Sequence, residues 1–222
     1  MTIRALIFDF DGLIIDTEST ELRAWEEVFL EHDCDLSPDV WADCIGRPPG
    51  FFDPATHLAS LTALEIDAAE IGTAVRRRAR AMAFEQPLLP GVSRWIDDAL
   101  ELGLATGIVS SSSRAWVESH LDRLGIRDRF PHLVCREDTP LHKPDPTPYR
   151  QMASALGIKP AEAIVLEDSP NGVAAAMAAG MWCIAVPGPV TRQLAFGPAT
   201  RMIDSLDSLT IRDMIASIES EP

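Results

Sequence analysis

The sequence of 222 residues lacks any hydrophobic run long enough to cross a membrane. A membrane-spanning helix needs about 20 predominantly apolar residues. The apolar N-terminal segment is interrupted at Asp9, which also argues against the hydrophobic region of a signal peptide. Tandem repeats and low-complexity tracts are absent as well. We therefore expect a cytoplasmic protein without a membrane partner.

Basic residues are scarce. The chain has 19 Lys and Arg against 34 Asp and Glu, which gives a formal net charge of −15. Proteins that bind nucleic acid neutralise phosphates with clustered cations, so this balance argues against a nucleic-acid partner. An acidic protein that binds a small anionic substrate needs a local metal ion or local cationic side chains.

Cysteine is also sparse, and its pattern argues against a metal-binding or disulfide framework. The four cysteines, Cys34, Cys44, Cys135 and Cys183, are scattered and form no C-x-x-C pair. We interpret them as small apolar residues of a protein kept in a reducing compartment.

Between residues 91 and 186 a helical pattern that ends at glycine is repeatedly followed by an apolar strand pattern. The glycines are Gly103, Gly125, Gly157 and Gly180. Glycine just beyond a helix adopts the left-handed conformation at no steric cost. Strands are predicted over 3–8, 104–109, 132–135, 163–166 and 182–186, with a further short strand ending at Ile203 and a terminal helix over 206–218. Such alternation predicts an α/β fold, a Rossmann-like parallel sheet with helices on both faces.

Residues 17–86 interrupt this alternation and contain no convincing strand. Leu22, Trp25 and Phe29 share one helical face, and Ile71 and Val75 begin a second such pattern that ends at Met82. We therefore predict that 1–16 and 87–222 form the core domain and that 17–86 form an inserted, all-helical domain.

Chemically active side chains follow the predicted strands or the loops beyond them. They are Asp9, Asp11, Ser110, Lys143, Glu167 and Asp168. In an open parallel sheet, ligands bind at the carboxyl ends of the strands, so we expect these groups to meet. Clustered carboxylates need a cation or a proton to offset their repulsion, and those of Asp9, Asp11 and Asp168 suit Mg²⁺. A hydroxyl, backbone N–H groups before a helix and a lysine suit a phosphate.

The order of these motifs is similar to that of the haloacid dehalogenase superfamily. The four matching segments are DFDGL, the apolar strand ending in Ser110, Lys143-Pro144 and Glu167-Asp168. The resemblance covers nearly the whole chain, and the inserted helices resemble the C1 cap of subfamily I. It implies a cofactor, Mg²⁺, and a small phosphorylated metabolite as the substrate.

The same resemblance implies a role for each motif residue. Asp9 would be the nucleophile that forms an aspartyl-phosphate. Asp11 would be the general acid and base, and its backbone carbonyl would bind Mg²⁺. Ser110, with Ser111 behind it, and Lys143 would bind the transferring phosphoryl group. Asp168 would be a metal ligand, and Glu167 a ligand or a partner of one.

Further substrate contacts are predicted at Arg47, Glu21 and Arg114. Arg47 lies in a Gly/Pro-rich loop that the resemblance places over the active site. Glu21 is a candidate for substrate hydroxyls, and Arg114 for a distal phosphate. Ser112 or Ser113 is expected to cap the helix that follows.

Within the superfamily, the segments DGLIIDTE, Arg23-Ala24-Trp25 and EDSPNG resemble phosphatases and β-phosphoglucomutases most closely. The mutases carry a histidine where this chain has Glu21, and a carboxylate cannot replace an imidazole near neutral pH. We therefore prefer a phosphatase. A phosphosugar mutase is the first alternative, and a non-catalytic protein that binds a phosphorylated metabolite is the second.

Overall fold

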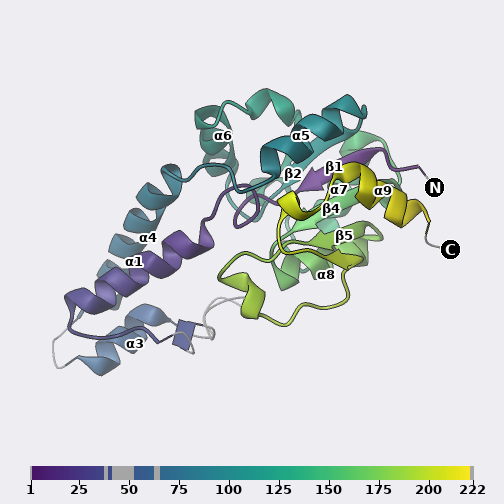
Figure 1. Cartoon of the computed structure of the whole chain (residues 1–222). Coiled ribbons are helices and arrows are strands. Elements are labelled where there is room, and N and C mark those ends of the chain that lie inside the picture. The colour runs from purple at the N-terminus through teal and green to yellow at the C-terminus, as the bar shows by residue number, and fades with distance from the viewer. Residues whose placement is uncertain (1, 38–39, 42–52, 63–65, 221–222) are drawn as a thin grey trace. The chain divides into compact units, whose positions relative to one another are not determined.

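The computed structural model describes residues 2–37, 40–41, 53–62 and 66–220 (Figure 1). Contacts between residues divide the chain into two units. The first unit comprises Met1–Ile15, Pro87–Gly188 and Ala195–Pro222, and the second comprises Asp16–Gln86 and Pro189–Leu194. The predicted Arg47 contact lies outside the described residues.

A six-stranded parallel sheet forms the centre of the first unit. Its strands are β1 (Ala5–Phe8), β2 (Ala105–Val109), β3 (His132–Val134), β4 (Ala163–Glu167), β5 (Trp182–Ala185) and β6 (Arg201–Met202), in the order β3-β2-β1-β4-β5-β6. β1 pairs with both β2 and β4, and Phe8 lies opposite Ile108 and Leu166. The strand order reverses around β1, which is where ligands bind in sheets of this kind.

Helices cover both faces of this sheet, which confirms the predicted fold class (Figure 1). α5 (Val92–Glu101), α6 (Arg114–Arg123) and α9 (Ile211–Glu219) pack on one face, and α7 (Thr147–Leu156) and α8 (Pro170–Ala179) pack on the other. Alternate residues of β1 serve the two layers. Leu6 and Phe8 contact the first group of helices, whereas Ala5 and Ile7 contact the second. β1 is therefore buried on both sides, as its unbroken apolar run predicted.

Glycines and capping side chains set where the helices end and begin. All four predicted helix-ending glycines have a positive φ, between 63° and 84°. The terminal helix starts at Ile211 rather than at residue 206, because Thr210 caps it by accepting the Asp213 N–H through its hydroxyl. Single 3₁₀ turns occupy Arg127–Arg129, Arg136–Asp138, Pro160–Glu162, Thr191–Gln193 and Leu206–Ser208.

The described part of the second unit is helical. Its helices are α1 (Glu18–Glu31), α3 (Pro54–Leu61) and α4 (Ala68–Phe84). Trp25, Phe29, Leu58 and Val75 pack together in its core, and Val190 joins them. The sequence placed 189–194 in the sheet domain, whereas its contacts place it in this unit. That the second unit acts as a cap stays a prediction.

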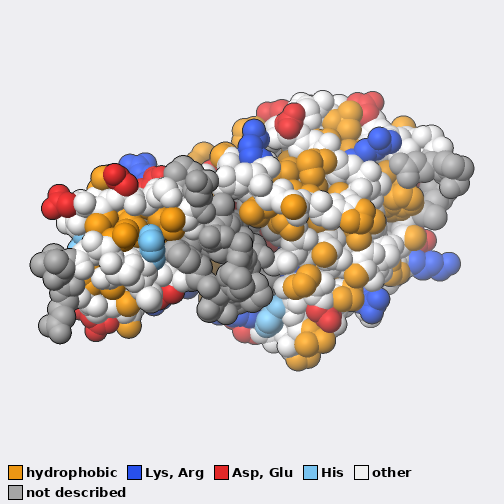
Figure 2. All heavy atoms as spheres, turned by 90° about the horizontal axis from the view of Figure 1, so that it is seen from below, with side chains coloured by type: hydrophobic (Ala, Val, Ile, Leu, Met, Phe, Trp, Pro, Cys, Tyr) orange, Lys and Arg blue, Asp and Glu red, His pale blue; other side chains and the backbone are white. Residues whose placement is uncertain are grey.

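Acidic side chains are scattered among apolar and basic ones on the face shown in Figure 2. The high negative charge of the chain is therefore not gathered into one patch on this face.

Among the described residues, no helix combines the length and the apolar character that a membrane span requires.

The start of α5 provides a test of the packing between distant segments. Gly91 has φ +83°, and a Cβ there would lie 2.5 Å from the carbonyl carbon of Leu206. Gly103 has φ +70° with nothing within 4 Å of its Cβ position. We expect Gly103→Ala to lower the free energy of unfolding by about 1–2 kcal/mol through backbone strain. Gly91→Ala should cost at least about 1 kcal/mol more, through overpacking.

Urea unfolding of the two variants measures this difference. Equal losses would contradict the close approach of Gly91 to the 206–207 backbone.

Candidate active site

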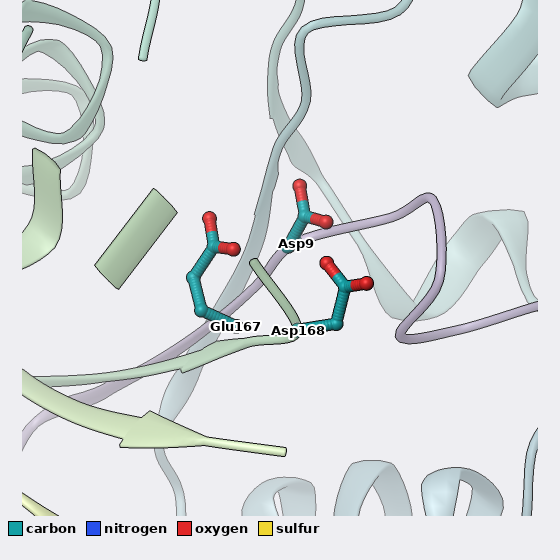
Figure 3. Close-up of side chains that lie close together, drawn as sticks. All are labelled: Asp9, Glu167 and Asp168. Atoms are coloured by element: carbon teal, nitrogen blue, oxygen red, sulfur yellow. The ribbon is translucent and has the colours of Figure 1, made fainter. Parts of the chain in front are cut away.

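Three carboxylates converge at the carboxyl ends of β1 and β4 (Figure 3). Asp9 directly follows β1, Glu167 is the last residue of β4, and Asp168 comes next. One oxygen from each lies within 4.8 Å of the others, and all three side chains are buried. Pairing of the two strands produces this convergence, since the Asp9 N–H also donates to the Leu166 carbonyl at 2.9 Å.

The ammonium group of Lys143 lies against two of these acids. Its Nζ donates to Asp9 Oδ1 at 2.5 Å, to Glu167 Oε1 at 2.6 Å and to the Val109 carbonyl at 2.9 Å. These three bonds use all the donors that a lysine has. Burial lowers the pKa of Lys143, but the charges of Asp9 and Glu167 outweigh it, and the net pKa is raised above its ordinary value. The lysine is therefore held charged.

One ammonium group does not neutralise three acids. Burial and the neighbouring Glu167 raise the pKa of Asp9 to about 8, although Lys143 acts in the opposite direction. A bound cation would supply the missing positive charge. Three buried carboxylates with oxygens this close suit a hard divalent ion such as Mg²⁺, which binds oxygen ligands. Asp9, Glu167 and Asp168 are thus the residues of this site that fit a metal.

Glycines allow the backbone to approach the acids. A Cβ at Gly12, which has φ +78°, would lie 2.2 Å from Asp168 Oδ2. A Cβ at Gly172, in the first turn of α8, would lie 1.9 Å from the Glu167 carboxyl group. Any larger residue at either position would displace a carboxylate.

Glu167 has two further partners. Tyr149 Oη donates to Glu167 Oε1 at 2.5 Å, and Ser169 Oγ donates to Oε2 at 3.2 Å. Tyr149 is fully buried in α7 and is the only tyrosine in the chain. Sequence patterns do not reveal this contact, because a buried aromatic residue in a helix gives the same pattern whether or not its hydroxyl reaches an acid.

Asp11 lies in a different environment from Asp9. It does not belong to the acidic group, and its carboxylate instead accepts hydrogen bonds from Ser110 Oγ at 3.3 Å and Trp116 Nε1 at 2.9 Å. Ser110 Oγ itself accepts the Ser112 N–H at 2.9 Å. The structure thus brings Asp11 and Ser110 together, as expected. Coordination of a metal by the Asp11 carbonyl stays a prediction.

The residues after β2 take separate positions. Ser110 is buried and Ser111 is exposed. Ser113 caps α6 by accepting the Trp116 N–H at 3.3 Å, which confirms that one of the two candidate serines is the cap.

Arg114, a further predicted substrate contact, is bonded to acids of its own surroundings. The Arg114 guanidinium donates to Asp138 Oδ2 at 2.6 Å and approaches Glu118 at 3.6 Å, so neighbouring acids hold it. Glu21 is exposed on α1, in the second unit. Contacts of Arg114, Glu21, Arg47 and Ser111 with a substrate stay predictions.

Residues 6–186 match the family model described as haloacid dehalogenase-like hydrolase. The chain belongs to this family. The resemblance that the four motifs indicated is thereby confirmed.

Curated relatives and solved structures resemble the chain over nearly its whole length. The putative phosphatase YhcW of Bacillus subtilis is 37% identical over 220 residues, which cover 99% of each chain. Hexitol phosphatase B of Escherichia coli K12 is 32% identical over 219 residues, covering 96% of this chain and 97% of the relative. The crystal structure of CbbY from Rhodobacter sphaeroides in complex with phosphate has a TM-score of 0.70 at 29% identity, covering 92% of this chain and 95% of the other.

The raised pKa of Asp9 predicts that metal binding releases a proton. Without a metal, Asp9 with a pKa of about 8 is mostly protonated at neutral pH. A bound cation favours the ionised form, so we expect release of about one proton per Mg²⁺ at about pH 7 and almost none at about pH 9.5. The apparent affinity should rise about tenfold per pH unit up to the pKa and then level off.

Isothermal titration calorimetry in buffers of different ionisation enthalpy counts the released protons. Proton release that is absent at neutral pH, or that does not fall as the pH rises, would contradict a protonated Asp9 in the metal-free protein.

Proposed function

We propose that this protein is a Mg²⁺-dependent phosphatase that hydrolyses a small phosphomonoester of the sugar-phosphate class through an aspartyl-phosphate on Asp9. One observation carries the proposal. The Asp9 carboxylate, at the carboxyl end of the central strand, accepts a hydrogen bond from the Lys143 ammonium group and lies within 4.8 Å of the buried acids Glu167 and Asp168. The names of the two curated relatives, both phosphatases, support the same reaction class.

In the first step, a carboxylate oxygen of Asp9 attacks phosphorus, and the bond between phosphorus and the substrate alcohol breaks. The negative charge on the phosphoryl oxygens needs nearby donors. The Ser110 hydroxyl can donate to one of these oxygens, and the charged Lys143 ammonium group beside Asp9 would offset their charge. Asp9, Asp168 and Glu167 would hold Mg²⁺, which would supply further positive charge to offset that of the phosphoryl oxygens.

Asp11 carries the proton in both steps. It gives a proton to the departing alcohol oxygen and then takes one from the water that attacks the aspartyl-phosphate. That second step regenerates the Asp9 carboxylate and releases inorganic phosphate. Asp11 accepts hydrogen bonds from two uncharged groups, the Ser110 hydroxyl and the Trp116 indole. The Lys143 ammonium group instead bonds Asp9 and Glu167.

Replacing the nucleophile tests the proposal directly. The purified protein should release inorganic phosphate from members of a sugar-phosphate panel when Mg²⁺ is present, and a chelator should abolish the release. Asp9→Asn should lower kcat on the order of 10⁴-fold or more, because loss of the attacking carboxylate removes the covalent step. Asp97→Asn is the matched control. Asp97 is exposed and pairs with Arg129, so turnover should stay unchanged.

Trapping of the intermediate provides a second measurement. Rapid quenching should add the mass of one phosphoryl group to the wild type at Asp9 and should add none to Asp9→Asn. Normal turnover in Asp9→Asn would contradict the assignment of the nucleophile.

The same assays separate the alternatives. Conversion of glucose 1-phosphate to glucose 6-phosphate without release of inorganic phosphate would show a mutase. Binding of phosphorylated metabolites without any turnover, with Mg²⁺ present, would show a non-catalytic binding protein.

A further inference from the structure

Trp116, which no motif singled out, donates its indole N–H to the proposed general acid. The residue lies in the first turn of α6, and its Nε1 is 2.9 Å from Asp11 Oδ1. The other carboxylate oxygen, Oδ2, faces the Ser110 hydroxyl at 3.3 Å. Each oxygen of Asp11 therefore has its own neighbour, and the two neighbours differ in chemistry.

The two neighbours differ in what they can accept. An indole N–H is a donor only, so Asp11 Oδ1 must act as the acceptor in this bond. The better acceptor of a protonated carboxyl group is the oxygen without the proton. A proton on Asp11 is therefore favoured on Oδ2, the oxygen that faces Ser110. A serine hydroxyl both donates and accepts, so it tolerates Oδ2 with or without the proton.

Packing and capping hold the indole in place. Its ring meets the buried His120 ring edge-on, with centroids 4.2 Å apart and an interplanar angle of 68°. The backbone N–H of Trp116 donates to the capping Ser113 hydroxyl at 3.3 Å. Val117 and Leu121 on the same helix are fully buried in the core. The position of the indole N–H relative to β1 is thus set by a rigid helix rather than by a loop.

We propose that Trp116 is a positioning residue for Asp11: by holding Oδ1, its indole N–H orients the carboxyl group so that Oδ2, on the side of Ser110, is the oxygen that exchanges the proton with the leaving group. This inference rests on the proposed phosphatase reaction. In that reaction the proton passes from Asp11 Oδ2 to the alcohol oxygen as the P–O bond breaks, and Trp116 exchanges no proton itself.

Leaving groups of different acidity separate positioning from a merely structural role. An alkyl phosphate such as glycerol phosphate needs protonation of its leaving oxygen, whereas p-nitrophenyl phosphate releases a stable phenolate without it. The ratio kcat/KM reports the steps up to departure of the leaving group. Trp116→Phe keeps an aromatic ring but removes the N–H. We expect kcat/KM to fall about 10–100-fold for the alkyl ester and less than about threefold for the nitrophenyl ester.

Two variants calibrate this result. Asp11→Asn should show the same dependence on leaving group with a larger loss on the alkyl ester, since it removes the acid itself. Trp182→Phe is the matched control. It also loses an indole hydrogen bond, from Trp182 Nε1 to the Ala161 carbonyl at 2.9 Å, and should leave the ratio between the two esters unchanged.

The outcomes are distinct. Equal losses on both esters in Trp116→Phe, or no loss on either, would overturn the positioning role and leave the phosphatase proposal standing. A wild type that hydrolyses neither ester, nor any member of the sugar-phosphate panel, would overturn both. If Trp116→Phe does not fold, replacing Trp116 with benzothienylalanine keeps the ring shape, substitutes sulfur for the N–H and should give the same selective loss.

Discussion

The site depends on the hydrogen bonds that the Lys143 ammonium group makes to Asp9, Glu167 and the Val109 carbonyl. This ammonium group joins Asp9, beyond the first strand, to Glu167, at the end of the fourth, and it also caps the Val109 carbonyl at the end of the second. A buried charge is costly unless it is paired and hydrogen-bonded, and here every donor of the lysine has an acceptor. The bonds therefore tie three neighbouring strand ends together at the point where the strand order reverses.

The same arrangement gives the site less positive charge than its three carboxylates would need for neutrality. One cation among three buried carboxylates cannot satisfy them all, and the raised pKa of Asp9 reports this imbalance. Stability alone would favour fewer buried acids. A protein that binds a divalent ion and an anionic group at this place gains from the imbalance, because the ion then binds to a preformed set of oxygens. Gly12 and Gly172 complete the arrangement by allowing the backbone to lie against two of the acids.

Two aspartates that are two residues apart thus experience different surroundings. Asp9 is buried against a lysine and other acids, whereas Asp11 turns toward a serine hydroxyl and an indole. A difference of this kind allows one carboxylate to serve as a nucleophile and its neighbour to handle protons. The partners that create the difference come from separate elements: Lys143 lies against Asp9, whereas Asp11 meets Ser110 at the end of β2 and Trp116 on α6.

The sequence by itself determined the parallel sheet, the helix-ending glycines and the motif residues, since strand periodicity and glycine conformation act over a few residues. It predicted the convergence of Asp9, Lys143, Glu167 and Asp168, because parallel strands expose their carboxyl ends on one edge. Only the tertiary structure decided the contact of Tyr149 with Glu167, the contact of Trp116 with Asp11, the pairing of Arg114 with Asp138, and the grouping of 189–194 with the second unit. Trp116 and Asp11 are 105 positions apart, and whether two such side chains meet depends on how a helix packs on a sheet, which no local pattern records.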